Sequence, residues 1–235
     1  AKGVPLRDTL PIGFKDVPEA GFKLERQNHM KERIAKKERK TKETDITVEL
    51  NIDGTGKYSI DTSIGFLDHM LELFAFHGLF DLKIKVNKGD FQIDIHHTNE
   101  DVAIVLGQVF KEALGDKEGI RRNGFASIPM ENVIANVTVD ISGRGSLLFT
   151  KSDTIASSIA YEKGGYTIGD AEHFFDAFAK HLGMNLIIKV DSPTMSQDLH
   201  TTLEPIFKAL GKALDQATQI DPRRKGIPST KGVID

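Results

Sequence analysis

Two distant segments of the 235-residue chain repeat one another without a gap. The segment DHMLELFAFHGLFDLKIKV is followed 104 residues later by EHFFDAFAKHLGMNLIIKV, so that His69 falls on His173 (173 − 69 = 104). The same spacing carries onward and places His96 on His200. A repeat at a fixed spacing indicates that one structural unit has been duplicated. We therefore expect two half-domains related by pseudo-symmetry.

The periodicity of apolar residues predicts the elements of each half. Residues 44–52 alternate between polar and apolar side chains, as in a strand, and the following DGTG is typical of a hairpin turn to a return strand at residues 58–60. Further strands are expected at 82–86, 91–95, 133–141, 147–149 and 186–190, and helices at 67–76, 98–114, 173–182 and 202–217. The pattern predicts an α+β fold in which a ββαββα-type unit occurs twice, with each sheet backed by helices.

The same patterns divide the chain into four segments. They are an N-terminal extension (1–40), a first half-repeat (41–125), a second half-repeat (126–220) and a C-terminal tail (221–235). The extension is interrupted by Pro and Gly, and residues 31–42 (KERIAKKERKTK) are dense in Lys and Arg. A solvated helix or a solvated extension is the favoured interpretation, and a basic arm that binds a partner is the alternative.

Composition narrows the chemistry that the chain can perform. It contains no cysteine, so disulfides and thiolate metal sites are excluded, and any metal must be held by His, Asp, Glu or carbonyl groups. The net charge of -3 gives no bulk attraction to nucleic acid or to a membrane surface. No apolar run approaches the roughly 20 residues of a membrane-spanning helix. We therefore expect neither a nucleic-acid partner nor a membrane span.

The run HHTNE at residues 96–100 carries the strongest functional signal. His96 and Glu100 are four residues apart, so on a helix they share one face and can bind one metal ion. His97 is rotated by about 100° and, as a ligand, would serve a second ion. Imidazole and carboxylate ligands suit Mn, Fe, Zn or Co, so the ligand types leave the metal open.

The second half repeats this spacing as His200 and Glu204, and His69 and His173 match each other on the preceding predicted helices. A single HHxxE run is more often part of a surface helix than a metal site. Its recurrence at a fixed offset is hard to explain by packing, so we predict metal binding.

A series of short segments extends the pattern and resembles the imidazoleglycerol-phosphate dehydratase family. In chain order the segments are TKETDITVELNIDGTGK, GFLDHML, FDL, HHTNEDVAIVLG, GIRRNG, the step Pro129-Met130-Glu131, DISGR, EHFF, EPIFKALGKAL and DPRRKGIPSTKGV. They run from about residue 39 to the C-terminus and are highly specific when taken together. The resemblance implies a dehydratase of histidine biosynthesis that converts imidazoleglycerol phosphate to imidazole-acetol phosphate by loss of water.

The resemblance also implies a cofactor, an assembly and a set of site residues. Two Mn²⁺ ions per site would hold the substrate imidazole as an imidazolate, in a 24-subunit shell with sites between subunits. The implied metal ligands are His69, His96, His97, Glu100, His173, His200 and Glu204. The implied catalytic residues are Glu43, His69, Glu100 and Glu204. The implied phosphate ligands are Arg122, Arg144, Lys208, Ser229 and Lys231, whose side chains suit a phosphate dianion. The compartment would be the cytoplasm, or the plastid stroma in a plant or alga.

Four features depart from the family pattern near these residues. Thr201 stands where the first half has His97, and Leu73 stands where the family usually has a glutamine. Ile95 stands where the family has an aspartate. Asp198 stands where the family has an asparagine, and in the same segment Pro205 follows Glu204. Because proline is tolerated only in the first turn of a helix, we expect the helix to begin near residue 202 and to leave His200 outside it.

Pseudo-symmetry predicts how the ligands divide between two ions. One ion would take His96, Glu100, His173 and residue 201, and the other would take His69, His97, His200 and Glu204. The first ion then lacks an imidazole. The alternative to an active dehydratase is therefore a weakened or inactive relative that binds one ion or none and serves as a structural or assembly subunit of a larger complex.

Overall fold

The computed structural model describes residues 33–152, 162–163, 165–192 and 198–234, so residues 1–32 of the predicted extension lie outside the described residues. The first half forms β1 (Ile34–Lys40), β2 (Asp45–Asn51), β3 (Tyr58–Asp61), α1 (Gly65–Gly78), β4 (Asp81–Lys88) and α2 (His96–Leu114). The second half forms β5 (Asn123–Met130), β6 (Val133–Asp140), β7 (Ser146–Lys151), β8 (Glu162–Lys163), β9 (Tyr166–Thr167), α4 (Ile168–Leu182), β10 (Asn185–Asp191) and α5 (Leu199–Thr218). No helix in these ranges is long and apolar enough to cross a membrane.

The two halves share one sheet topology, which confirms the predicted duplication and the α+β class. One sheet has the strand order β1-β2-β4-β3 and the other has the order β5-β6-β10-β7. In both sheets the last pair in this order is parallel and the other pairs are antiparallel. β4 and β10 keep the spacing of 104 (185 − 81), whereas β3 and β7 are 88 apart (146 − 58). The 16 extra residues (104 − 88) lie before α4 and include the hairpin β8–β9.

The repeated unit has the order βββαβα rather than the predicted ββαββα, and the difference begins at the DGTG turn. β3 does not return beside β2 as a hairpin partner but pairs in parallel with β4. Asp81, at the start of β4, accepts hydrogen bonds from the backbone N–H groups of Thr55 (2.8 Å) and Lys57 (3.0 Å). A Cβ on Gly54 would lie only 2.3 Å from the Asp81 backbone nitrogen. The turn therefore carries the chain across the end of β4 to the edge of the sheet.

Two predicted boundaries and one predicted strand are wrong. Residues 34–40 form β1, an edge strand paired with β2, so this part of the lysine-rich stretch is neither a helix nor part of an extension. The predicted boundary between residues 125 and 126 falls inside β5, the corresponding edge strand. Lysines in β1 and Pro129 in β5 are typical of edge strands, and they interrupt the alternation of polar and apolar residues by which a strand is recognised in a sequence. Residues 91–93 form a turn, with Phe91 and Ile93 exposed.

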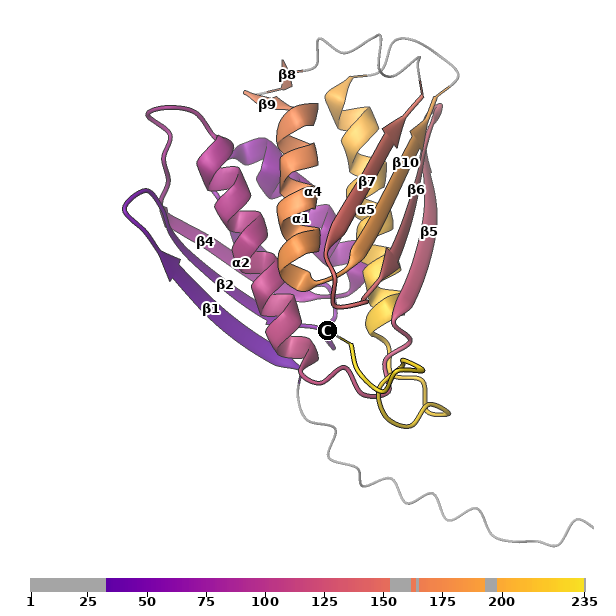
Figure 1. Cartoon of the computed structure of the whole chain (residues 1–235). Helices are drawn as coiled ribbons and strands as arrows, with labels where there is room; N and C mark the ends of the chain where they lie inside the picture. The colour runs from indigo at the N-terminus through magenta and orange to yellow at the C-terminus, as the bar shows by residue number, and fades with distance from the viewer. Residues whose placement is uncertain (1–32, 153–161, 164, 193–197, 235) are drawn as a thin grey trace, which may run out of the picture. The chain divides into compact units, whose positions relative to one another are not determined.

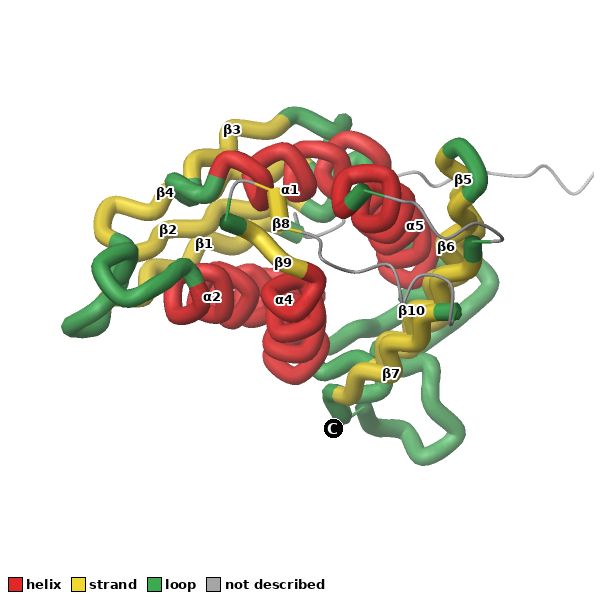
Figure 2. The backbone as a smooth tube through the Cα atoms, turned by 90° about the horizontal axis from the view of Figure 1, so that it is seen from above, coloured by secondary structure: helices red, strands yellow, loops and turns green. Residues whose placement is uncertain are grey.

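The helices lie between the two sheets (Figures 1 and 2). α2 packs on β1 and β2, and α5 packs on β5 and β6. Helices of different halves pack against one another, α1 with α5 and α2 with α4. At the centre Phe74 of α1 meets Phe178 of α4 edge to face, with ring centroids 6.1 Å apart. The hydrophobic core therefore joins the two halves.

Glycines at related positions allow both helix pairs to pack closely. Gly107 of α2 and Gly211 of α5 are 104 residues apart. A Cβ on Gly107 would lie 2.8 Å from the Phe178 carbonyl oxygen, and a Cβ on Gly211 would lie 2.5 Å from that of Phe74. Any side chain at either position would push the helices apart. The same two helix pairs carry the histidine contacts of His69 with His200 and of His96 with His173.

Candidate metal centre and active site

The helix pair α1 and α5 brings together three of the predicted metal ligands, His69, His200 and Glu204, which we call the α1–α5 cluster. Their ligand atoms all lie within 4.8 Å of one another. His69 Nε2 is 3.3 Å from His200 Nε2, and Glu204 Oε2 is 2.9 Å from His200 Nε2 and 3.7 Å from His69 Nε2. Three donor atoms at these separations can converge on one ion at about 2.0–2.2 Å.

Glu204 carries a negative charge in this cluster. Burial of its side chain raises the pKa, but the hydrogen bond and charge of Lys208, together with the charges of His200 and His69, outweigh burial. The net effect lowers the pKa of Glu204 below its ordinary value of 4.5. Lys208, one helical turn further on, pairs with Oε1 and leaves Oε2 to the histidines. Glu204 is therefore available as an anionic ligand at neutral pH.

The helix pair α2 and α4 brings together His96 and His173, which we call the α2–α4 pair. Their Nδ1 atoms are 3.1 Å apart, and the rings meet edge to face. Two nitrogen atoms at this separation can both reach one ion at about 2.1 Å. Glu100 is exposed, and among the described residues it belongs to neither group of three or more ligand atoms within 4.8 Å of one another. The α2–α4 pair thus has two of its expected ligands in place within the protomer.

His97 forms a third set with Asp90 and Glu43, which we call the His97 group, and its ring meets that of His96 edge to face with centroids 5.8 Å apart. Asp90 Oδ2 lies 2.9 Å from His97 Nδ1, and Glu43 Oε2 lies 4.0 Å from it. The hydrogen bond to Asp90 raises the pKa of His97 above 6.5 despite some desolvation, and the charge of Glu43 adds to this effect. Within one protomer His97 therefore does not join His69, His200 and Glu204, because residue 97 leaves α2 on another face.

Pro205 does not displace His200 as expected. α5 begins before His200, which keeps its 2.9 Å contact with Glu204 although Pro205 lies inside the helix. Asp198 caps the helix, because its Oδ1 accepts a hydrogen bond of 2.7 Å from the backbone N–H three residues further on. A carboxylate at this position satisfies a free N–H group and favours the positive end of the helix. Asp198 therefore fixes the start of α5 upstream of His200.

The other three departures are buried or partly buried. Thr201 is 6% exposed, and Leu73 and Ile95 are partly buried and pack against the hydrophobic core. Thr201 belongs to neither group of clustered ligand atoms among the described residues. These substitutions therefore leave the atoms of the α1–α5 cluster in place.

Most of the predicted phosphate ligands gather near Arg122. Its guanidinium pairs with Asp140, with an Nε–Oδ1 distance of 2.6 Å, and it also donates to the Pro228 carbonyl oxygen at 3.1 Å. This contact brings the C-terminal tail, with Ser229 and Lys231, beside Arg122. The hydrogen bond to Asp140 raises the pKa of Arg122, so the guanidinium stays charged.

Lys208 lies apart from this group. The Arg122 N–H bonds to the Ala217 carbonyl near the end of α5, nine residues beyond Lys208 (217 − 208). At 1.5 Å per residue this separation is about 14 Å along the helix. Arg144 lies at the Arg122 end, because it follows Ile141, whose N–H bonds to the Arg122 carbonyl. Within one protomer the predicted phosphate ligands thus fall into two places.

The donor atoms fit a divalent cation bound through nitrogen and oxygen. The α1–α5 cluster offers two imidazole nitrogens and a charged carboxylate, and the α2–α4 pair offers two more imidazoles. Such a set suits Mn, Fe, Co or Zn. The residues present are therefore compatible with the metal centre that the sequence predicts.

Sequence reasoning missed Asp90, Asn99 and Tyr166. Asp90 stands in a loop without periodicity, seven residues before its partner His97 (97 − 90), and no local signal connects the two. Asn99 lies inside the HHTNE run, and its complete burial is the sign of a structural role. Tyr166 bonds to Asn99 across 67 residues, a contact that no sequence pattern indicates.

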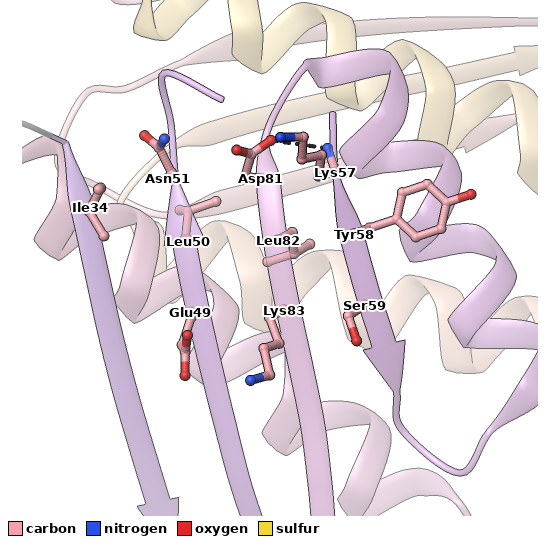
Figure 3. Close-up of a pocket in the computed structure, with 10 residues that line it drawn as sticks. All are labelled: Ile34, Glu49, Leu50, Asn51, Lys57, Tyr58, Ser59, Asp81, Leu82 and Lys83. Atoms are coloured by element: carbon pink, nitrogen blue, oxygen red, sulfur yellow. Dashed lines mark hydrogen bonds between the residues drawn. The ribbon is translucent and has the colours of Figure 1, made fainter. Parts of the chain in front are cut away.

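A separate hollow lies on the side of the first sheet that carries Glu49, Lys83 and Ser59 (Figure 3). Its lining residues are Ile34, Glu49, Leu50, Asn51, Lys57, Tyr58, Ser59, Asp81, Leu82 and Lys83. None of them is a predicted site residue. This hollow is therefore not part of the candidate metal centre.

Comparisons with known proteins extend over most of the chain. The family profile described as imidazoleglycerol-phosphate dehydratase matches residues 62–214, which include all the predicted metal ligands. Imidazoleglycerol-phosphate dehydratase of Thermoanaerobacter sp. is 50% identical over 202 residues, covering 86% of this chain and 100% of the relative. The enzyme of that name from Pelobacter propionicus is 48% identical over 202 residues, covering 86% of this chain and 99% of the relative.

A solved structure agrees with these relatives. The crystal structure of the Pyrococcus furiosus dehydratase in complex with (S)-C348 has a TM-score of 0.69 and 34% identity, covering 84% of this chain and 99% of that chain. The similarity thus holds in three dimensions as well as in sequence. Matches of this length and identity show that the chain belongs to the imidazoleglycerol-phosphate dehydratase family.

Proposed function

We propose that the chain catalyses the dehydration of imidazoleglycerol phosphate to imidazole-acetol phosphate in histidine biosynthesis. The observation that carries the proposal is the α1–α5 cluster, where residues from helices far apart in the sequence bring two imidazoles and a charged carboxylate together. Family membership supplies the substrate, and this cluster supplies a site at which a metal ion can act.

The proposed chemistry assigns a role to each group of side chains. Divalent cations, which we propose to be two Mn²⁺ ions per site, would supply charge stabilisation for the substrate's imidazole ring as a carbon-bound proton leaves. His69, His200 and Glu204 would hold one ion, and the α2–α4 pair would hold the other with Glu100. Glu43 would accept the proton, since its carboxylate is exposed to an incoming substrate in the turn between β1 and β2.

A complete site would need more than one protomer. Lys208 stands beside the α1–α5 cluster, about 14 Å along α5 from the end of the helix where Arg122, Arg144, Ser229 and Lys231 are found. The His97 group shares no residue with the α1–α5 cluster, although the rings of His97 and His96 are in contact. We therefore propose that neighbouring copies contribute these residues to one another's sites.

The second sheet offers a surface suited to such an assembly. Phe125, Ile187 and Leu148 are 52%, 45% and 54% exposed and fall in one row across the sheet by strand register, with Thr138 of β6 between Phe125 and Ile187. Exposed large apolar side chains grouped on a sheet surface are typical of an interface. It supports a homo-oligomer, for which we propose the 24-subunit shell, working in the cytoplasm or, in a plant or alga, in the plastid stroma.

Turnover after removal and return of the metal tests the proposal. The metal-free protein should be inactive, and added Mn²⁺ should restore conversion of imidazoleglycerol phosphate to the ketone product. Glu204→Gln should stay inactive, whereas Glu118→Gln, which makes the same change on an exposed loop, should behave like the wild type. One bound ion or none, without any turnover, would instead support the inactive relative, which the comparisons do not favour.

A further inference from the structure

Asn99 connects the two helices that carry the α2–α4 pair. Its side chain is fully buried. Its Nδ2 donates a hydrogen bond to the Asp170 carbonyl oxygen (2.8 Å), and its Oδ1 accepts one from the Tyr166 hydroxyl (2.9 Å). Both ends of the buried amide are thus paired, which is the condition under which such a group is tolerated in a protein interior.

Both partners of Asn99 belong to the start of α4. Asp170 lies in the first turn of the helix, where a capping box with Thr167 fixes the backbone. Tyr166 immediately precedes that turn, is completely buried, and packs on Phe66 with ring centroids 5.4 Å apart. One side chain of α2 therefore holds α4 through its first turn and through the strand that leads into it.

These hydrogen bonds lie next to the histidines of the α2–α4 pair. His96 precedes Asn99 by three residues, and His173 follows Asp170 by three, so each histidine is about one helical turn away. His96, His173 and Asp170 line one surface hollow. A shift of α2 along α4 would change the 3.1 Å separation between the two Nδ1 atoms directly.

We propose that Asn99 and Tyr166 are positioning residues for a metal ion held by the α2–α4 pair. The inference rests on the proposed metal function and adds the residues that set the site's geometry. Neither side chain is a ligand. They act by fixing the distance between His96 and His173, two ligands on different helices that share no clustered carboxylate among the described residues.

The related position in the other half shows why this contact is specific to one site. Residue 203 (99 + 104) is Leu203, which is fully buried and apolar. Tyr166 lies in β9, within the extra residues of the second half, so the first half has no counterpart to it. In the α1–α5 cluster the contact between helices is made by Glu204, which lies 3.7 Å from His69. The hydrogen bonds of Asn99 are thus found between the two helices whose histidines have no carboxylate clustered with them.

A Mn²⁺ titration of the metal-free protein, followed by calorimetry, tests the proposal. His173→Ala identifies the binding step that belongs to the α2–α4 pair. Tyr166→Phe should weaken that step about 10-fold, the effect typical of losing an outer partner of a metal ligand, and should leave the other step unchanged. Tyr58→Phe removes the same hydroxyl from an exposed tyrosine of β3 and should change neither step.

A double variant separates positioning from stability. Asn99→Leu combined with Tyr166→Phe removes both polar groups together, so the melting temperature should return toward that of the wild type. The weakened binding step should persist. Binding that recovers with the melting temperature would overturn the positioning role, as would unchanged binding in Tyr166→Phe alone. A wild-type protein that binds no Mn²⁺ would overturn the proposed function together with this inference.

Discussion

The two helix pairs carry the same histidine pattern in different chemical settings. Between α1 and α5 the imidazoles meet a buried, charged Glu204 whose second oxygen is held by Lys208. Between α2 and α4 the imidazoles meet without a clustered carboxylate, and Asn99 joins the helices instead. The glycine contacts that bring each pair together are alike in both halves. Duplication has therefore preserved the scaffold while the groups around the histidines have diverged.

This difference implies unequal metal affinities. A cluster that already holds a carboxylate beside two imidazoles attracts a divalent cation more strongly than a pair of imidazoles whose carboxylate, Glu100, stands outside the cluster, because the clustered carboxylate adds a direct charge interaction at short range. We expect the α1–α5 cluster to bind first and the α2–α4 pair to bind second. The predictions that follow test this order, from the largest expected effect to the smallest.

Replacing the carboxylate of the stronger site should have the largest effect. Glu204→Gln keeps the size of the side chain and removes its charge. The Mn²⁺ affinity of the α1–α5 cluster should therefore fall by more than about 100-fold, which exceeds the loss caused by removing a hydrogen-bond partner of a metal ligand. Turnover should fall by about 1,000-fold, since the ion is proposed to stabilise charge in the reaction. Steady-state kinetics and a Mn²⁺ titration measure both effects, and residual activity above a tenth of wild type would contradict the assignment.

Removing a ligand of the weaker site should lower the stoichiometry. His173→Ala should reduce bound Mn²⁺ from two ions to one per protomer and leave the tight step in place. Elemental analysis of dialysed protein gives the ratio. His181→Ala, on the same helix but outside the clustered groups, serves as the control. Loss of both ions in His173→Ala would show that the two sites are not separate.

The charge of Lys208 should act on metal binding and on the substrate. In Lys208→Met the pKa of Glu204 should rise, because burial then acts without its main opposing partner. Metal binding depends on the ionised carboxylate, which is present above its pKa, so binding should fail at a higher pH than in the wild type as the solution is acidified. The KM for the phosphorylated substrate should rise about 10-fold, as expected for one lost charged contact. If metal binding failed at the same acidic pH in both proteins, the charge of Lys208 would not act on Glu204.

The sequence could predict the duplication and the residues of the α1–α5 cluster. The repeat is visible as sequence similarity at a constant spacing without gaps, and helical spacing alone places His200 and Glu204 on one face. It could not predict that β3 pairs in parallel with β4, because that depends on the contact of Asp81 with a distant turn. It also misjudged Pro205, whose effect is offset by the Asp198 cap and by tertiary packing of α5.

The separation of the His97 group shows a further limit of the repeat. Spacing indicates which residues share a helix face, but it does not say which other elements lie opposite that face. Asp90 and Glu43 meet His97 through a loop and a turn, both outside any periodic pattern. Asn99 and Tyr166 likewise come together across two halves of the chain.

The smallest expected effect concerns stability at alkaline pH. Burial, with a contribution from the charge of Asp170, raises the pKa of Tyr166 well above 10. A raised pKa means that the neutral phenol stabilises the fold fully below pH 10 and that this stabilisation is lost as the pH rises further. Above pH 10 the free energy of unfolding should fall more steeply in the wild type than in Tyr166→Phe. The difference between the two slopes should be about 1.4 kcal/mol per pH unit. Urea unfolding across this range measures it, and parallel curves would contradict a buried, hydrogen-bonded phenol.

Anomalous diffraction from crystals prepared with one equivalent of Mn²⁺ per protomer tests the inequality of the two sites most directly. The map locates the ion without reference to activity or stability. The predicted result is a strong peak between His69, His200 and Glu204, with a second peak at His96 and His173 appearing only at higher Mn²⁺. A first peak at His96 and His173, or equal peaks at both places, would contradict the account.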